Sequence, residues 1–474
     1  MFGTGQNGNT QEMVLYFATE TVTTVRVEIP GIGYSQTYAN IPANTIFTSQ
    51  PLPKGGGADA RLTTAGVLNR GIHITSDKPI VAYAHIYNQN VSGATLLFPT
   101  NTLGKEYYSV NFEQRSNEDN SNSFVYAIAT DTGTTQVEVT PSAGNTLGLT
   151  PGVPQLYSLK QGEVLNLLGT LSGFNGTDLT GTRIRSIASG GSGCKRIAVY
   201  SGSGKIYISC PGTGNNQSAD NYMVQAFPQT AWGKQYLTVP TRNFEHNFYR
   251  IAVTDPTTVV RVNGQVLTGL IGNFYYQLTP FTAGNGGSTN KPLRIEADKP
   301  VMVAQYISTQ GVCNNGAVGD PEVIYLSPVE QNIDRVILNS TGNFQITASF
   351  INVVIPNRGT GVSSFKIDGA APSVPFTVHP ENPDYAYVQI PVSAGQHNLQ
   401  SDSGFNAIAY GYGNAESYGY NAGANVKDLY QFVSVQNQYA TVSFPATCSN
   451  APFFFYMTFP YQPLQIKWQF SGLF

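Results

Sequence analysis

The chain has 474 residues, of which 11% are charged and 12% aromatic, and its formal net charge is -3. This balance supplies no basic surface for a phosphate backbone, and no apolar run is long enough to cross a bilayer, so we expect neither nucleic-acid binding nor a membrane span. The length allows about three or four domains.

The first predicted elements are two neighbouring strands within residues 14–29. The apolar side chains of residues 25–29 alternate with Arg26 and Glu28, which is the period of a strand with one buried face. The same pair recurs twice in full and once in eroded form, at residues 124–139, 248–264 and 363–369. The chain is therefore a tandem repeat.

A more continuously apolar strand follows later in each copy. In copies one and three an Asp-Lys-Pro triplet introduces it, at Asp77 and at Asp298. The equivalent strands lie at residues 80–83, 195–200, 301–304 and 405–410. The weaker alternation predicts a strand nearer the middle of the core, and the spacing of the triplets gives a unit of about 110 residues.

A third repeated segment joins one copy to the next. Phe98-Pro99, followed by Gly104-Lys105 and Tyr107, returns with the same spacing as Phe227-Pro228, Gly233-Lys234 and Tyr236. The segment is degenerate at residues 326–337, and copy four stops at residues 428–433.

Short strands separated by Pro-Gly and Ser-Gly turns predict an all-β fold of tandem β-sandwich-like repeats, with another β-repeat architecture such as a propeller as the alternative. The predicted domains are four β repeats, the last divergent, and the truncated start of a PKD-like or Ig-like domain, at residues 1–112, 113–240, 241–340, 341–437 and 438–474. We expect the natural protein to continue beyond this last segment and its leader to be missing.

The four cysteines are widely spaced and form no metal knuckle. Cys194 and Cys210 flank one strand and its loop in copy two, so we predict a disulfide between them, with Cys210 to Cys313 as the rival pairing. Buried free thiols are the remaining alternative.

No catalytic constellation stands out, so we predict no catalytic residues, no cofactor and no enzyme. The densest group of oxygen ligands is Asn117, Glu118, Asp119 and Asn120, a weak calcium candidate that we otherwise interpret as a solvated linker. Asp320 and Glu322 are a weaker candidate still. Tyrosines in a Gly-rich stretch form a candidate contact surface, against the alternative of ordinary sheet packing: Tyr410, Tyr412, Tyr418 and Tyr420.

Together, the strand pair, the Asp-Lys-Pro strand and the Phe-Pro and Gly-Lys segment resemble the IgGFc-binding protein N-terminal domain family, well over residues 11–340 and weakly over 341–437. This family occurs in an animal mucus protein and in large bacterial surface proteins with PKD-like modules. The segment containing Cys448 and Trp468 resembles the bacterial kind, which implies a secreted adhesin of gliding Bacteroidetes that use type IX secretion. Immunoglobulin binding is implied only by the family name.

These features favour a non-enzymatic extracellular adhesion or binding module of a cell-surface protein, with a protein or glycan ligand. A structural subunit that self-associates through strand edges is one alternative. A glycan-binding or glycan-processing protein is another, which would require two carboxylates about 5 to 10 Å apart beside stacked aromatic rings.

Overall fold

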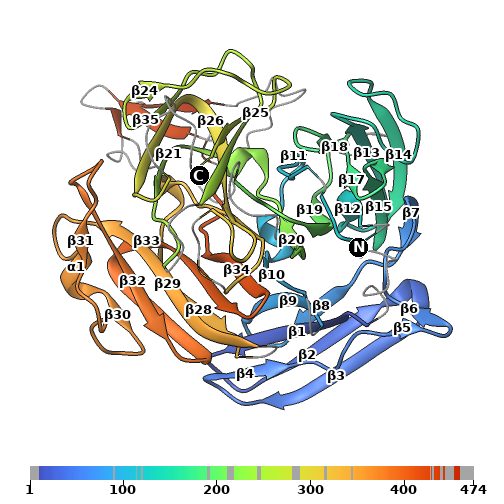
Figure 1. Ribbon diagram of the computed structural model, residues 1–474, viewed down its shortest axis with the longest axis horizontal. Coiled ribbons are helices and arrows are strands. Elements are labelled where there is room, and N and C mark those ends of the chain that lie inside the picture. Colours follow the sequence, from blue (N-terminus) through green and yellow to red (C-terminus); the bar gives the residue numbers. More distant parts are fainter. Residues whose placement is uncertain are drawn as a thin grey trace. The chain divides into compact units, whose positions relative to one another are not determined.

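A computed structural model describes residues 10–88, 91–113, 115–118, 121–188, 193–210, 218–242, 247–279, 289–313, 316, 318–342, 345–427, 429, 432–437, 441–442 and 453–458. The chain forms two compact units, Met1–Asn425 and Val426–Phe474. Almost all regular structure in the described residues is β-strand, which confirms the predicted all-β class (Figure 1). The helical elements are η1 (Pro30–Ile32), η2 (Thr100–Thr102), η3 (Gln229–Ala231), η4 (Val329–Gln331) and α1 (Gly361–Ser364).

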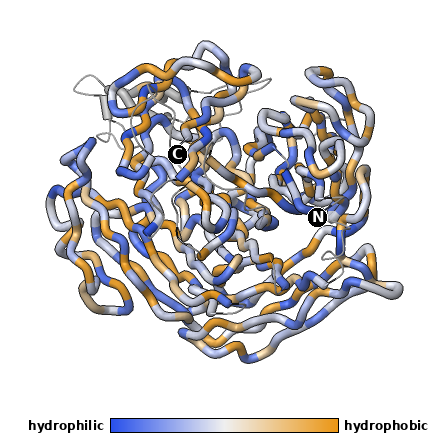
Figure 2. The backbone as a smooth tube through the Cα atoms, viewed as in Figure 1, coloured by the Kyte–Doolittle hydropathy of each residue, from blue (hydrophilic) through white to orange (hydrophobic). Residues whose placement is uncertain are grey.

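The first repeat has two main sheets that face each other, with strand orders β10-β9-β1-β4 and β3-β2-β8, and a separate two-stranded sheet of β5 and β6. Val25, Val27 and Ile29 of β2 are fully buried and pack in one core with Phe17 of β1, whereas Arg26 is exposed and Glu28 half-buried, as their alternation predicts. Figure 2 shows hydrophobic and hydrophilic positions alternating along the backbone. The strands are β1 (Glu12–Thr19), β2 (Thr23–Ile29), β3 (Tyr34–Ile41), β4 (Thr45–Thr48), β5 (Lys54–Gly55), β6 (Ala58–Asp59), β7 (Gly66–Asn69), β8 (His73–Ser76), β9 (Val81–Tyr87) and β10 (Ser92–Leu97).

The second repeat has sheets of order β20-β19-β12-β15-β7 and β11-β18-β13-β14. Its first sheet therefore includes β7 from the first repeat, and Phe124 and Tyr126 of β12 belong to the first repeat's core. The strands are β11 (Glu106–Tyr108), β12 (Ser123–Ala129), β13 (Thr134–Thr140), β14 (Gln155–Lys160), β15 (Glu163–Leu168), β16 (Leu171–Ser172), β17 (Asn175–Gly176), β18 (Arg183–Ile187), β19 (Ile197–Ile206) and β20 (Asp220–Gln225).

In the third and fourth repeats one long strand, β26 or β33, takes part in both sheets. The third repeat contains β21 (Gly233–Thr238), β22 (Phe248–Val253), β23 (Val260–Val262), β24 (Gln265–Val266), β25 (Tyr275–Leu278), β26 (Leu293–Ile307) and β27 (Glu322–Tyr325). The fourth contains β28 (Ile333–Ser340), β29 (Ile346–Pro356), β30 (Lys366–Ile367), β31 (Thr377–Val378), β32 (Tyr385–Val392), β33 (Gly395–Gly413) and β34 (Glu416–Gly423).

The Asp-Lys-Pro triplets lie where the chain passes from one sheet to the other. Asp77 accepts hydrogen bonds from Thr23 Oγ1 (2.6 Å) and Thr24 N (2.7 Å), and Asp298 accepts one from Val259 N (2.8 Å). Each carboxylate thus ties this crossing to the start of the alternating strand, so the triplet is a structural motif.

Four inner strands, one from each repeat, form a closed cycle of contacts in the order β10, β20, β27 and β34. In Figure 1 the four repeats of Met1–Asn425 follow one another around the labelled inner strands β10, β20 and β34. Every residue of β20, β27 and β34 is buried, which explains why these segments do not alternate.

The repeated Gly-Lys segments are linkers that supply the first strand of the following repeat. The first segment, residues 104–108, contains β11, which pairs with β18. The second, residues 233–238, is β21, which pairs with β26. Tyr107 OH donates to Ile197 O (2.9 Å) and accepts from Gly104 N (2.8 Å). Tyr236 OH donates to Val301 O (2.6 Å).

The second unit is described at β35 (Phe432–Asn437), β36 (Thr441–Val442) and β37 (Phe453–Thr458), which form a three-stranded sheet of order β36-β35-β37. The Cys448 and Trp468 positions of the predicted PKD-like start lie outside the described residues. In the part of the chain that is described, no helix has the length and apolar character needed to cross a membrane.

Candidate functional site

The inner strands of the four repeats begin with polar residues. β10, β20, β27 and β34 start at Ser92, Asp220, Glu322 and Glu416, and each of these side chains is 0% exposed. Asp320, which precedes β27, is equally buried. The cycle of inner strands therefore concentrates four carboxyl groups inside the protein, where charged groups are costly unless they are paired.

Hydrogen bonds across the inner strands fix the positions of these groups. Asp220 Oδ1 accepts from Ser92 N (2.8 Å) in the first repeat, and Glu322 Oε2 accepts from Gly419 N (3.2 Å) in the fourth. Asp320 Oδ2 accepts from Ser218 Oγ (2.7 Å), just before β20. The carboxyl groups thus bridge each repeat to a neighbour.

Four oxygens of this group have no hydrogen-bond partner among the described residues: Asp220 Oδ2, Asp320 Oδ1, Glu416 Oε1 and Glu416 Oε2. Burial raises the pKa of Asp320 to about 7. Burial and then the neighbouring Asp320 raise the pKa of Glu416 to about 9, and burial raises those of Asp220 and Glu322 strongly. Several of these groups are therefore neutral acids at pH 7.

A buried lysine lies near this cluster of four carboxyl groups. Lys205 is 4% exposed, and its charge lowers the pKa of Asp320 and Glu416 against the effect of burial. Its ammonium lies 3.4 Å from Glu118 Oε1 and donates to Asn117 Oδ1 (3.3 Å). Because no member of the cluster is exposed, the arrangement offers no acid or base to an external substrate.

Of the four predicted calcium ligands, Asn117, Glu118, Asp119 and Asn120, the structure describes only the first two. Asn117 and Glu118 face the ammonium of Lys205, whereas Asp119 and Asn120 lie outside the described residues. Within the described ranges, no three His, Cys, Asp or Glu side chains are placed to share a metal ion. Calcium binding at residues 117–120 stays a prediction, and the melting temperature in EDTA tests it.

The predicted tyrosine contact surface is wrong. All four rings are buried: Tyr410 0%, Tyr412 1%, Tyr418 0% and Tyr420 5% exposed. Tyr410 OH donates to Asn352 Oδ1 (2.7 Å), and Tyr418 OH donates to Ser349 Oγ (3.0 Å). The Gly residues between them let neighbouring strands approach, so these tyrosines are packing residues, as the alternative interpretation held.

The predicted disulfide between Cys194 and Cys210 is also wrong. Cys210 is bonded to Cys313, with their Cα atoms 5.1 Å apart, and Cys194 is a free, half-buried thiol. The rival pairing prevails because the loops that follow the equivalent strands β19 and β26 lie together, where Thr309 N donates to Ile208 O (2.9 Å). The bond joins the second repeat to the third.

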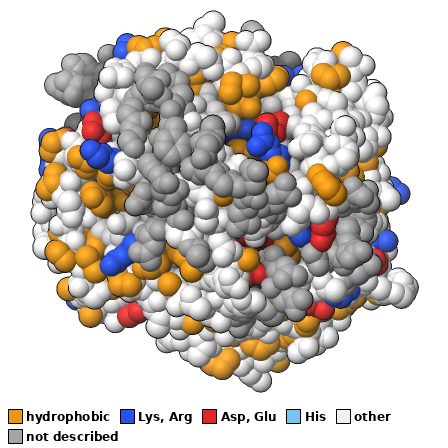
Figure 3. Space-filling view, viewed as in Figure 1, with side chains coloured by type: hydrophobic (Ala, Val, Ile, Leu, Met, Phe, Trp, Pro, Cys, Tyr) orange, Lys and Arg blue, Asp and Glu red, His pale blue; other side chains and the backbone are white. Residues whose placement is uncertain are grey.

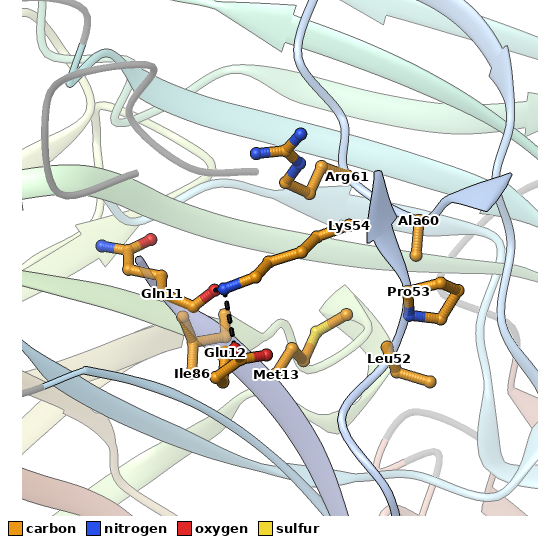
Figure 4. Close-up of a pocket in the computed structure, with 9 residues that line it drawn as sticks. All are labelled: Gln11, Glu12, Met13, Leu52, Pro53, Lys54, Ala60, Arg61 and Ile86. Atoms are coloured by element: carbon orange, nitrogen blue, oxygen red, sulfur yellow. Dashed lines mark hydrogen bonds and ion pairs between the residues drawn. The ribbon is translucent and has the colours of Figure 1, made fainter. Parts of the chain in front are cut away.

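The cavities of the described residues are either small or lie between repeats. One of about 20 Å³, roughly the size of a water site, is lined by Gln11, Met13, Leu52 and Ile86 (Figure 4). Lys54 extends across it to Glu12, with 2.7 Å between Nζ and Oε1. This site is too small for an organic ligand.

Sequence reasoning did not single out Asp220 or Glu416. The available signal is an acidic residue at the first position of the buried inner strand in the second, third and fourth repeats. Asp320 and Glu322 were considered only as weak calcium ligands, because sequence spacing does not show that inner strands from four repeats meet.

Residues 93–411 match the model of the family described as IgGFc binding protein. The match runs from β10 in the first repeat to β33 in the fourth, so it extends further than the region of strong resemblance predicted from the motifs and begins later. No curated protein matches the chain.

Proposed function

Because this chain belongs to the IgGFc binding protein family, we propose that it is a non-enzymatic, extracellular binding module whose ligand is a protein. The finer proposal is that it acts in adhesion at a cell surface. The observation that carries the proposal is the family match over residues 93–411, which runs from β10 of the first repeat through the second and third repeats to β33 of the fourth.

The chemistry of the described residues supports binding better than catalysis. The carboxyl groups with raised pKa values are buried at the inner strands, where no substrate reaches them. The visible face of the molecule in Figure 3 carries scattered Lys, Arg, Asp and Glu among mainly uncharged side chains. Such a surface suits shape-specific contacts with a protein rather than electrostatic capture of a polyanion.

The test measures binding of the purified chain to immobilised proteins, with immunoglobulin Fc and mucin glycoproteins as the first ligands, each before and after enzymatic deglycosylation. We expect saturable binding to a protein ligand that survives deglycosylation. Binding that disappears with the glycans would favour the glycan-binding alternative. Hydrolytic turnover that a single substitution abolishes would contradict a non-enzymatic module.

A structural role is the second candidate, and a specific feature favours it. The outer sheet of the first repeat ends in β8, whose second edge has no partner strand among the described residues. Exposed edges can join one chain to another. Concentration-dependent assembly of the purified chain into filaments would support this role.

A further inference from the structure

The linker strands occupy the same place in three of the four repeats. β11 pairs with β18, which lies just before the crossing between the sheets, and β21 and β28 pair with the N-terminal parts of β26 and β33, which precede the same crossing. In the first repeat the equivalent strand is β8, which pairs with β2 on one side. On its other side no strand lies among the described residues, so in that part of the chain one linker position is open.

The register shows which residue of β8 faces this open position. Tyr107 of the first linker lies opposite Ile184, and Tyr236 of the second lies opposite Ile295. On the other side of the same strands, Ile184 lies opposite Val139 and Ile295 lies opposite Val262 of the alternating strand. Ile74 lies opposite Val27 in the same way, so Ile74 is the counterpart of these two isoleucines. Ile184 and Ile295 are 2% and 0% exposed, whereas Ile74 is only half-buried. Ile74 therefore lacks the cover that a linker tyrosine gives its counterparts.

Backbone donors at this edge point toward the open position. Asp77 N donates to a carbonyl of the alternating strand (3.3 Å), and because successive strand amides point to opposite sides, the amides of Ile74 and Ser76 face outward. In the second repeat the amide of Ser186, which corresponds to Ser76, donates to Lys105 O of the linker (2.8 Å). The open edge thus presents the same donors that hold a linker elsewhere.

A cavity of about 340 Å³ continues this edge. Its walls include Pro79 and Ile80, which precede β9, and Val336 of β28. In the third repeat Gly233 lies opposite Val301, which follows its Asp-Lys-Pro triplet as Ile80 follows that of the first repeat. The ring of Trp232 packs 5.9 Å from that of Tyr108 on the preceding linker strand. The cavity therefore corresponds to the position that Trp232 and Gly233 fill in the third repeat.

We propose that the open edge of β8 and this cavity bind an extended segment of a partner protein, which adds to the outer sheet as an antiparallel strand. The segment carries a bulky apolar residue, then glycine, and a tyrosine three positions after the glycine, as Trp232, Gly233 and Tyr236 do. The apolar residue enters the cavity, and the tyrosine covers Ile74. This proposal rests on the proposed function, because it says how the module would hold a protein ligand. Peptide binding is measured separately from binding to whole proteins, so the two proposals can fail independently.

The experiment titrates the full chain into a fluorescent synthetic peptide with the sequence of residues 227–240 and follows anisotropy. We expect saturable binding, weakened at least about tenfold when the positions corresponding to Trp232 and Tyr236 are both alanine, since stacking and burial of two aromatic side chains are lost. Absence of saturable binding by the parent peptide overturns the proposal.

Variants of the chain locate the binding site. Ser76→Pro removes an amide that faces the open edge, and Ile74→Lys places a charge beneath the bound tyrosine. Both are expected to abolish peptide binding at a temperature at which each variant is folded; the melting temperature of Ile74→Lys is measured first, because Ile74 packs against the core of the first repeat. Ile74→Lys alone decides if Ser76→Pro does not fold. The matched control is Val266→Lys on the edge strand β24, where the parent side chain is 48% exposed, and it is expected to bind normally. Unchanged binding by Ile74→Lys overturns the proposal.

Discussion

Arg250 is a charged side chain held almost completely inside the protein. Its Nη1 donates to Asp178 Oδ2 and Asn111 O, both at 2.6 Å, and its guanidinium lies over the rings of Phe112 (4.5 Å) and Tyr275 (4.3 Å). Arg250 belongs to β22 of the third repeat, whereas Asn111 follows β11 and Asp178 precedes β18, two strands that pair in the second repeat. One residue thus joins two repeats through charge, hydrogen bonding and stacking.

We expect Arg250→Met to lower the free energy of unfolding by about 3–5 kcal/mol, because it removes the cation that pairs with the partly buried carboxylate of Asp178. It also removes one of the two donors to Asn111 O, of which only Tyr306 OH then remains. Denaturant unfolding measures the loss. Arg294→Met is the matched control, since its partner Glu296 is on the surface and the two side chains are 36% and 27% exposed, so the loss should stay below about 1 kcal/mol. Equal losses in the two variants would contradict the role of Arg250.

The buried carboxyl groups make stability depend on pH. Asp320 and Glu416 have native pKa values of about 7 and about 9, raised from 3.8 and 4.5, so the native state binds more protons than the unfolded chain between about pH 4 and 9. Their stabilising effect is complete below the unfolded values and is lost as the pH rises through the native ones. We expect the free energy of unfolding to fall from pH 5 to pH 9.

Glu416→Gln isolates this contribution, because the amide cannot ionise. Its unfolding free energy should fall less steeply with pH than that of the parent, since a tenfold difference in proton affinity between the native and unfolded states corresponds to about 1.4 kcal/mol. Denaturant unfolding at several pH values between 5 and 9 gives the two slopes. Parallel slopes would show that Glu416 does not titrate in this range.

At the scale of elements, successive linkers pack closely because a glycine of one linker faces a proline of the next. A Cβ atom at Gly104 would lie 2.3 Å from Pro228 Cβ, and one at Gly233 would lie 2.2 Å from Pro328 Cβ. Each glycine therefore accepts the proline that begins the next linker. The spacing of Pro and Gly is repeated in the sequence because successive linkers contact each other.

Gly233→Ala is expected to lower the free energy of unfolding by about 1–3 kcal/mol, since the proline ring and the neighbouring backbone must move apart. The melting temperature and denaturant midpoint report the loss. Gly57→Ala serves as the control, because a Cβ atom there would meet nothing within 4 Å. A Gly233→Ala protein as stable as the Gly57→Ala protein would show that the linkers are not close-packed.

Local periodicity was enough to predict the elements but not their partners. The alternation around Val25 and Val27 correctly predicted a strand with one buried face, and the continuous apolar run at Val81 correctly predicted a central strand. Pairing between β11 and β18 depends on contacts between distant segments, which no local pattern records. The same limit explains why the sequence leaves Tyr410 open between a contact surface and sheet packing, and why it does not reveal the cluster around Glu416.

The repeats of Met1–Asn425 share their cores, and this determines how the unit should unfold. Tyr16 of the first repeat packs in one cluster with Ile351 of the fourth, and Phe124 of the second packs with Phe17 of the first. Tyr410 of the fourth belongs to the core of the third. In an open solenoid, terminal repeats can unfold separately, whereas here each inner strand contacts inner strands from two other repeats.

We therefore expect the four repeats to unfold together. In native-state hydrogen exchange, the slowest amides of β1, β12, β22 and β29 should share one opening free energy, because no repeat can leave without exposing its neighbours' apolar side chains. Phe124→Ala, which removes a shared core side chain, should lower that value in all four strands by about 3–5 kcal/mol. If it lowered only the values of the first two repeats, the repeats would be independently stable and the cycle of inner strands would not couple them.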